Sequence, residues 1–237
     1  LLGVEQAERP VVFIGPYEHH SNILPWRESR AEVVEIPEGA EGGVDLAALE
    51  AALLHHAAAD LMIGSFSAAS NVTGIVTDPD PVTRLLRAHG ARAVWDYAGG
   101  GPYLPIDMGE HGAEPKDAVV VSPHKFPGCP GASGVLILRR GAVRSTMPSW
   151  PGGGTVSFVS PWSHRYADSL AAREEAGTPN VVGDSRAALA FLVKEAVGQE
   201  DIEAREAQYA AKARAAWGAL PGLGWDRLMV RSWVQMG

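Results

Sequence analysis

The chain has 237 residues, of which 46% are hydrophobic and 20% are charged, and its formal net charge is −8 at pH 7. This length and composition are those of a globular protein that can bury a full core within one large domain. The negative charge disfavours nucleic acid and anionic membranes as partners, because neither is attracted to an acidic surface. We expect no targeting segment or membrane span, and the single cysteine, Cys129, favours a reducing cytoplasm without disulfides.

The first part of the chain alternates apolar strands with helical segments. This alternation predicts an α/β fold, a mostly parallel sheet flanked by helices on both faces. The predicted strands lie near residues 11–15, 31–36, 60–66, 92–96, 117–122 and 133–138. The predicted helices lie near residues 18–28, 45–57 and 80–90.

Two adjacent histidines, His19 and His20, follow the first predicted strand. Neighbouring side chains on a helix point in different directions, so these two cannot both face one metal ion. One of them has a role in a pocket, or both are ordinary polar residues at a helix start. The eight histidines of the chain do not combine with cysteines or carboxylates at ligand spacing, and the sequence therefore predicts no metal site.

Polar residues also follow the third and fourth predicted strands. Asn71 could donate a hydrogen bond to a phenolate oxygen of a ligand, or it could satisfy its own turn. Asp96 ends the fourth strand, and in open α/β sheets this edge is where ligands bind. An aspartate there can pair with a protonated ring nitrogen of a cofactor, although it could instead cap a turn before the glycines at 99–101.

The fifth predicted strand runs into Ser122-Pro123-His124-Lys125. A buried strand would deliver the lysine amine into a pocket at the same edge of the sheet. An amine that is desolvated or crowded by positive charge can lose its proton and form a Schiff base with an aldehyde. Lys125 is therefore the first candidate for a cofactor anchor, and the alternative is a solvated lysine in a loop.

The second part of the chain is less regular. Residues 152–166 begin with three glycines and predict a long irregular loop, which in a compact domain is usually functional or interfacial. Residues 183–217 predict two helices broken at Gly198. The alanine stripe and the apolar face of these helices are expected to pack rather than to form a binding surface, and the apolar face includes Leu189, Phe191, Leu192 and Val193.

Six motifs, in this order, resemble the class V aminotransferase family of pyridoxal-phosphate enzymes, which includes cysteine desulfurases and selenocysteine lyases. The motifs are Glu18-His19-His20-Ser21-Asn22-Ile23-Leu24-Pro25-Trp26, Ser70-Asn71-Val72-Thr73-Gly74, Asp96-Tyr97-Ala98, Ser122-Pro123-His124-Lys125, Gly152-Gly153-Gly154 and Glu175-Ala176-Gly177-Thr178-Pro179-Asn180. The resemblance covers most of the chain. It implies that residues 1–237 are the large domain of a fold-type I transferase, incomplete at both ends and without a second complete domain.

The resemblance implies a role for each matching residue. Lys125 would form the Schiff base with pyridoxal 5'-phosphate, and Asp96 would pair with the pyridine nitrogen. His19 would stack on the ring and assist proton transfer, while Asn71 would contact the ring hydroxyl.

Three further residues would hold the cofactor phosphate. Ser122 and His124 supply a hydroxyl and an imidazole, both of which can donate hydrogen bonds to a phosphate dianion. Thr178 matches the position that reaches a phosphate across the interface of a homodimer in this family. Each site would then need two chains.

Two residues bear on which member of the family the chain resembles. Gly99 stands where the family usually has a glutamine that contacts the ring hydroxyl, which favours a divergent subgroup in which Tyr97 or Asn71 offsets the loss. Cys129 lies just past Lys125, whereas the persulfide cysteine of desulfurases lies elsewhere. We interpret Cys129 as a small buried hydrophobe.

The favoured activity is cleavage of a carbon–sulfur or carbon–selenium bond in an amino acid, as in cysteine desulfurases and selenocysteine lyases. Transamination or epimerisation of another amino acid is the alternative within the family. Two other classes stay open: a non-catalytic scaffold of the same fold, and an unrelated α/β module that binds a phosphorylated small molecule through residues 122–125. The expected partners are a small amino-acid substrate and a second copy of the chain.

Overall fold

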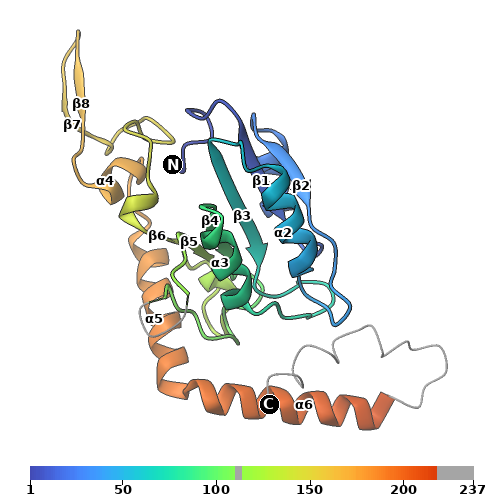
Figure 1. Ribbon diagram of the computed structural model, residues 1–237. Coiled ribbons are helices and arrows are strands. Elements are labelled where there is room, and N and C mark those ends of the chain that lie inside the picture. The colour runs from blue at the N-terminus through green and yellow to red at the C-terminus, as the bar shows by residue number, and fades with distance from the viewer. Residues whose placement is uncertain (110–113, 218–237) are drawn as a thin grey trace.

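A six-stranded sheet forms the centre of the protein (Figure 1). The structure is a computed structural model, and it describes residues 1–109 and 114–217 of the predicted large domain. The strands are β1 (Pro10–Ile14), β2 (Glu32–Glu35), β3 (Leu61–Ser67), β4 (Arg92–Asp96), β5 (Ala118–Val121) and β6 (Val135–Leu138). Their order is β2-β1-β3-β4-β5-β6; the first five are parallel and β6 runs antiparallel to β5. All six predicted strands and the mostly parallel α/β fold are confirmed.

The helices lie around and beyond this sheet. Those in the first part are η1 (His20–Asn22), α1 (Leu24–Arg27), α2 (Leu46–His55), α3 (Pro79–Ala88) and η2 (Pro123–Lys125). Those in the second part are η3 (Arg140–Ala142), α4 (Leu170–Glu174), α5 (Val181–Val197) and α6 (Gln199–Trp217). Within residues 1–109 and 114–217, no helix combines the length and apolar character that crossing a membrane requires.

Two clusters of buried side chains lie on opposite faces of the sheet, because successive residues of a strand point to opposite sides. In β1, Val11 and Phe13 join the larger cluster, whereas Val12 and Ile14 join the smaller one. Helices α2, α3 and α5 cover the larger cluster. The smaller cluster is covered by the first residues of the chain and by the segment that carries Trp26, rather than by a long helix.

The helix predicted near residues 18–28 is wrong in its extent. His19 has an extended backbone, a single 3-10 turn follows, and α1 is only four residues long. The side chains of Glu18 and Asn22 form hydrogen bonds with β3 and with each other. These tertiary contacts hold the segment against the sheet and override its helical preference.

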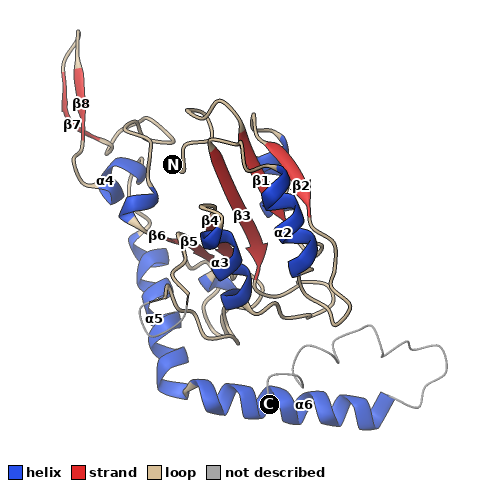
Figure 2. Ribbon diagram, viewed as in Figure 1, coloured by secondary structure: helices blue, strands red, loops and turns tan. Residues whose placement is uncertain are grey.

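Residues 152–166 contain regular structure that the sequence analysis did not predict. Strands β7 (Val156–Val159) and β8 (His164–Tyr166) pair antiparallel as a separate two-stranded sheet. The hairpin projects away from the central sheet, as Figure 2 shows. Ser160 closes its tip through a backbone hydrogen bond to Ser163 of 2.7 Å.

The two long helices predicted in residues 183–217 are confirmed, and they meet at Gly198. This glycine has a φ of +87°, a conformation that side chains with a Cβ rarely adopt. The packing prediction is wrong for Leu189, Leu192 and Val193, since these three side chains are all more than half exposed. The prediction is confirmed for the alanine stripe of α5, since Ala187 and Ala190 are buried.

Candidate active site

The carboxyl ends of β3, β4 and β5 meet at one edge of the sheet. Ser67 at the end of β3 is the register partner of Asp96, and Asp96 is the partner of Val120 in β5. Ser122 follows β5 directly, and η2 then presents Lys125. The sheet register therefore brings Asp96 to the edge where the lysine segment leaves the sheet, which is where parallel α/β sheets bind ligands.

Asp96 is almost buried, with 8% of its surface exposed. Its Oδ1 accepts a hydrogen bond of 2.7 Å from the backbone N–H of Ala98. The aspartate thus caps the turn after β4, as the alternative interpretation expected, while its carboxylate stays at the edge of the sheet. The turn fixes the side chain in place, which suits a residue that pairs with a ligand.

The neighbouring Tyr97 is buried. It belongs to the core cluster on the other face of the sheet, and with Asp80 and Lys116 it lines a cavity of about 190 Å³. Burial raises the pKa of the Tyr97 hydroxyl, and the negative charges of Asp80, Asp107 and Asp78 raise it further.

The lysine segment is held by its backbone, and its polar side chains are free to reach outward. The N–H of Lys125 donates to the carbonyl of Ser122 at 2.9 Å, and the next residue, Phe126, is buried. His124 and Lys125 are both exposed, and Ser122 is half-buried. Phe126 packs edge-on against Phe191 of α5, with 5.5 Å between the ring centroids. This contact anchors the turn that presents the amine.

Asn71 lies beside Gly99. A Cβ built on Gly99 would be 3.4 Å from the carbonyl oxygen of Ala69 and 3.9 Å from the Cβ of Asn71. The turn of Asn71 is capped by Ser70, whose Oγ accepts from the N–H groups of residues 72 and 73. Asn71 itself is exposed and lies against Gly99.

His19 lies at the same end of the sheet. Its Nδ1 accepts a hydrogen bond of 3.2 Å from the backbone N–H of Ser21, and the Ser21 hydroxyl lies 3.0 Å from the same nitrogen. Because a backbone N–H can only donate, the proton of the neutral His19 ring belongs on Nε2. The rings of His19 and His20 lie 3.8 Å apart.

Glu18 is a functional candidate that the sequence analysis missed. Its Oε1 accepts from the backbone N–H of Ser67 at 2.9 Å, and its Oε2 accepts from the Ser67 hydroxyl and from Asn22 Nδ2, each at 2.6 Å. Asn22 Oδ1 in turn accepts from the indole of Trp26 at 3.2 Å and from the hydroxyl of Ser65 at 2.6 Å. The spacing of Glu18, Asn22 and Trp26 at every fourth residue is the signal that could have revealed it.

Burial raises the pKa of the Glu18 carboxyl, and the hydrogen bonds from Ser67 and Asn22 oppose this rise. The nearby negative charge of Asp96 raises it further. The carboxyl of Glu18 is therefore electrostatically linked to the aspartate at the edge of the sheet.

Thr178 is exposed on the segment between α4 and α5. Asn180 fixes this segment, because its Oδ1 accepts from the N–H of Gly183 and its Nδ2 donates to the Ser133 hydroxyl at 3.3 Å. The segment is thus docked on the loop that follows Lys125. No contact among the described residues joins Thr178 to Ser122 or His124.

Cys129 is 7% exposed and belongs to the core cluster that also contains Phe126 and Ala190. A thiol in these surroundings acts as a small apolar side chain. The position agrees with the structural role expected from the sequence.

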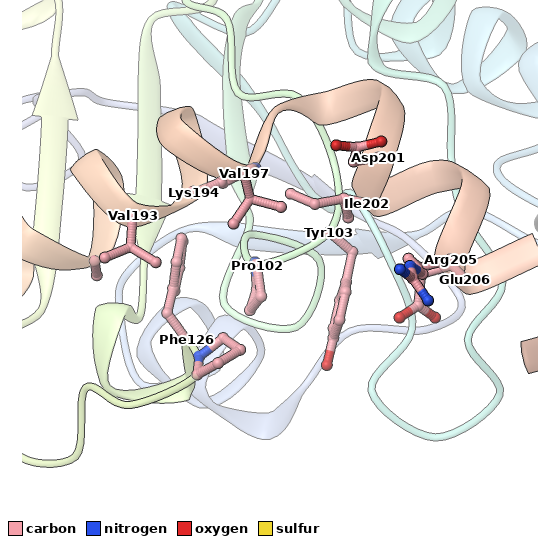
Figure 3. A pocket seen from close by; sticks show the side chains of 12 residues that line it. Pro102, Tyr103, Phe126, Val193, Lys194, Val197, Asp201, Ile202, Arg205 and Glu206 are labelled. Carbon is pink, nitrogen blue, oxygen red and sulfur yellow. The ribbon is translucent and has the colours of Figure 1, made fainter.

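A cavity of about 430 Å³ lies where α5 and α6 meet the loop after β4 (Figure 3). Tyr103, Phe126 and Val193 are among the side chains that line it. Lys194 of α5 donates to the carbonyl oxygen of Gly101 at 2.8 Å and also to that of Leu104. Burial lowers the pKa of this lysine to about 8. These contacts tie α5 to the loop that follows Asp96.

Residues 3–229 match the model of the aminotransferase class-V family. The chain belongs to this family. A cysteine desulfurase from Pectobacterium atrosepticum is 33% identical over 213 residues, which are 85% of this chain and 49% of that protein. A probable cysteine desulfurase from Pyrococcus abyssi is 31% identical over 195 residues, 81% of this chain and 46% of the relative. This class-V chain thus spans about half the length of the curated relatives that it matches.

Solved structures agree on the fold of this aminotransferase class-V chain. The cysteine desulfurase CsdA from Escherichia coli superposes with a TM-score of 0.75 at 25% identity, over 93% of this chain and 54% of that one. The apo cysteine desulfurase from Thermococcus onnurineus has the same TM-score at 24% identity, over 91% of this chain and 53% of the other. The similarity to the Thermococcus onnurineus structure supports the fold alone.

Proposed function

We propose that the chain binds pyridoxal 5'-phosphate at the carboxyl edge of its sheet and forms part of an enzyme that acts on an amino acid. The observation that carries this proposal is the register of β3, β4 and β5, which sets Asp96 beside the strand that delivers Lys125. The family match supports it, because class-V aminotransferases carry out their chemistry with this cofactor.

The groups at this edge fit the cofactor chemically. An exposed amine can bind an aldehyde carbon, a nearly buried carboxylate can pair with a protonated ring nitrogen, and a hydroxyl with an imidazole can donate to a phosphate. Asn71 is exposed beside Gly99, so its amide is available to donate to a ring hydroxyl. The donor set therefore covers the aldehyde, the ring and the phosphate.

Each residue then has a specific task. Lys125 binds the aldehyde through Nζ, and Asp96 keeps a proton on the ring nitrogen. His19 lies against the ring, and Asn71 donates to its hydroxyl. When bound, pyridoxal phosphate supplies an electron sink for the bonds at the substrate α-carbon. The amine of Lys125 would also be the base that accepts the α-proton of the substrate.

Ser122 and His124 hold the phosphate from this chain, and Thr178 holds it from a second copy. Thr178 is exposed on a segment that Asn180 fixes to the loop after Lys125, so it is available to another protomer. We therefore propose a homodimer with shared sites, working in the cytoplasm.

The substrate proposed is a sulfur- or selenium-containing amino acid such as cysteine or selenocysteine. Both curated relatives described above are named cysteine desulfurases, one of them as probable. Transamination or epimerisation of another amino acid is the alternative outcome. Incubating the loaded protein with cysteine, selenocysteine and alanine, and measuring sulfide, selenide and keto acid, would distinguish them.

The cofactor is tested by the visible absorbance of the protein after incubation with pyridoxal phosphate. We expect a band near the wavelength of lysine-bound cofactor in the wild type and none in Lys125→Ala. Lys212→Ala is the matched control, because this lysine is exposed on α6, far along the chain from the site. A wild-type protein without the band, or a band that survives in Lys125→Ala, would contradict the proposal.

A further inference from the structure

We propose that Glu18 is a positioning residue, which holds His19 at the carboxyl edge of the sheet. It does so through a hydrogen-bond network in which the indole of Trp26 determines which atoms donate and which accept. The inference rests on the proposed function in one respect, since it takes His19 to lie against the bound ring. That Glu18 fixes the segment of His19 follows from contacts within the chain alone. Glu18 precedes His19 directly, so whatever fixes its side chain also fixes the backbone from which the imidazole projects.

The network has a defined direction of donation. The indole Nε1 of Trp26 can only donate, so the side-chain atom of Asn22 that faces it must be the oxygen. The amide nitrogen of Asn22 then points at Glu18 as a donor. Glu18 must therefore offer an acceptor, which a carboxylate provides and an amide nitrogen does not.

The carboxylate occupies a slot at the end of β1. A Cβ built on Gly15 would lie 2.8 Å from Oε1 of Glu18 and 3.2 Å from the ring of Phe66. The missing side chain at Gly15 thus makes room for the carboxylate. A glycine at this strand end is explained by the close approach of Glu18.

The slot ties the histidine segment to the edge of the sheet. Glu18 accepts from both the backbone and the side chain of Ser67, and Ser67 is the register partner of Asp96. One carboxylate therefore sets the distance between the segment of His19 and the strand of Asp96. The binding of the pyridoxal ring between the imidazole of His19 and the carboxylate of Asp96 depends on that distance.

The first test is Glu18→Gln, which keeps the size of the side chain but replaces one acceptor oxygen with a donor. The amide nitrogen would face the amide of Asn22, a donor against a donor. We expect the affinity for pyridoxal phosphate, measured by titration, to fall about tenfold to a hundredfold, as expected for a lost hydrogen bond to a buried charge. Glu28→Gln is the matched control, because Glu28 is exposed at the end of α1, and it should bind as the wild type does.

A second readout needs no cofactor. NMR of the ring nitrogens in the full-length protein, with the His19 signals identified by their loss in His19→Gln, reports which nitrogen carries the proton. In the wild type we expect a single signal pair with the proton on Nε2 of His19. In Glu18→Gln we expect this signal to broaden or split, because the segment is no longer held, and the midpoint of thermal unfolding to fall, because a buried hydrogen bond is lost.

The decisive variant is the double substitution Glu18→Gln with Trp26→Phe. Without the indole donor, Asn22 can rotate its amide and offer its oxygen to the introduced amide. We expect the double variant to bind pyridoxal phosphate within about threefold of Trp26→Phe alone, which is a coupling that independent structural damage would not give.

Additive losses in the double variant, or a Glu18→Gln protein with wild-type affinity and a wild-type His19 signal, would overturn the inference. If the wild type itself does not bind pyridoxal phosphate, the proposed function fails. The NMR comparison of wild type, Glu18→Gln and the double variant then still decides whether Glu18 positions His19.

Discussion

Gly99 lies against Asn71, and a Cβ on the glycine would be 3.9 Å from the Cβ of the asparagine. This is ordinary van der Waals contact, so the position can accept a side chain without displacing its neighbour. Gly99 does not adopt a left-handed backbone, unlike the glycines with positive φ elsewhere in the chain. The absence of a glutamine here is therefore not forced by the fold.

We expect Gly99→Gln to leave the midpoint of thermal unfolding unchanged or slightly raised and to tighten the binding of pyridoxal phosphate about fivefold, the effect of one added hydrogen bond. Titration of the absorbance band measures the affinity. Gly99→Leu is the control, because it adds similar volume without an amide and should not tighten binding. Equal affinities in the two variants would show that the glutamine has no partner here.

The contact of Lys194 with the loop after β4 predicts a dependence of stability on pH. Burial lowers the pKa of this lysine from 10.5 to about 8 in the folded protein. Between these two pH values the unfolded chain binds the proton and the folded chain does not, so stability must rise with pH across this window. The neutral amine keeps two hydrogens for the two carbonyls that it contacts.

Urea unfolding of the wild type and of Lys194→Met at pH 7, 8, 9 and 10 tests this. The free energy of unfolding of the wild type is expected to rise relative to that of the variant as the pH increases from 8 to 10. Lys212→Met provides the baseline, because Lys212 is exposed and its substitution should give a flat difference. A flat difference for Lys194→Met as well would mean that its amine titrates at its ordinary pKa.

The sheet could be predicted from the sequence because its strands are apolar runs separated by turn residues, and each run is recognisable by itself. The site at its edge followed from the same rule, which set Asp96 and Lys125 at the ends of neighbouring strands. What the sequence did not reveal depends on contacts between distant residues. Glu18 meets Ser67 across 49 positions, and that contact both shortens the predicted helix and creates the network beside His19.

The second part of the chain was harder to predict for a related reason. The hairpin of β7 and β8 forms between short strands that follow a run of glycines, and pairing rather than local preference defines it. The apolar residues of α5 look like a core pattern, yet Leu189 and Leu192 are exposed because the helix packs on the sheet through its alanines. The spacing of apolar residues along a helix shows which of them share a face, but it does not show which face is buried.

The core of the sheet contains a hydrogen bond that can be tested directly. The indole Nε1 of Trp95 donates to Oγ1 of Thr83 at 2.9 Å, and both side chains are fully buried. Thr83→Val keeps the shape and leaves the indole unsatisfied, which should lower the free energy of unfolding by about 1–3 kcal/mol. Denaturant unfolding measures it. The double variant with Trp95→Phe should cost less than the sum of the two single losses, and strict additivity would contradict a direct bond.

Gly64 in the middle of β3 lies in a tightly packed part of the core, where an added methyl group is expected to reduce stability. A Cβ there would lie 2.5 Å from Cδ1 of Leu86 and 2.7 Å from the ring of Phe66, closer than any real contact. Both neighbours are fully buried, so they cannot move aside into solvent. We expect Gly64→Ala to lower the free energy of unfolding by about 1–3 kcal/mol, the usual cost of forcing a methyl group into a packed core.

The cost of Gly64→Ala should be relieved in part by Leu86→Val, because shortening the leucine opens space where the methyl group enters. Gly134→Ala is the matched control: this glycine also lies near a strand, has nothing within 4 Å of its ideal Cβ, and should change stability by less than about 0.5 kcal/mol. Denaturant unfolding of the four proteins and of the double variant measures these differences. If Gly64→Ala were as stable as Gly134→Ala, helix α3 would not be packed against β3 as closely as the contact of Leu86 with Gly64 requires.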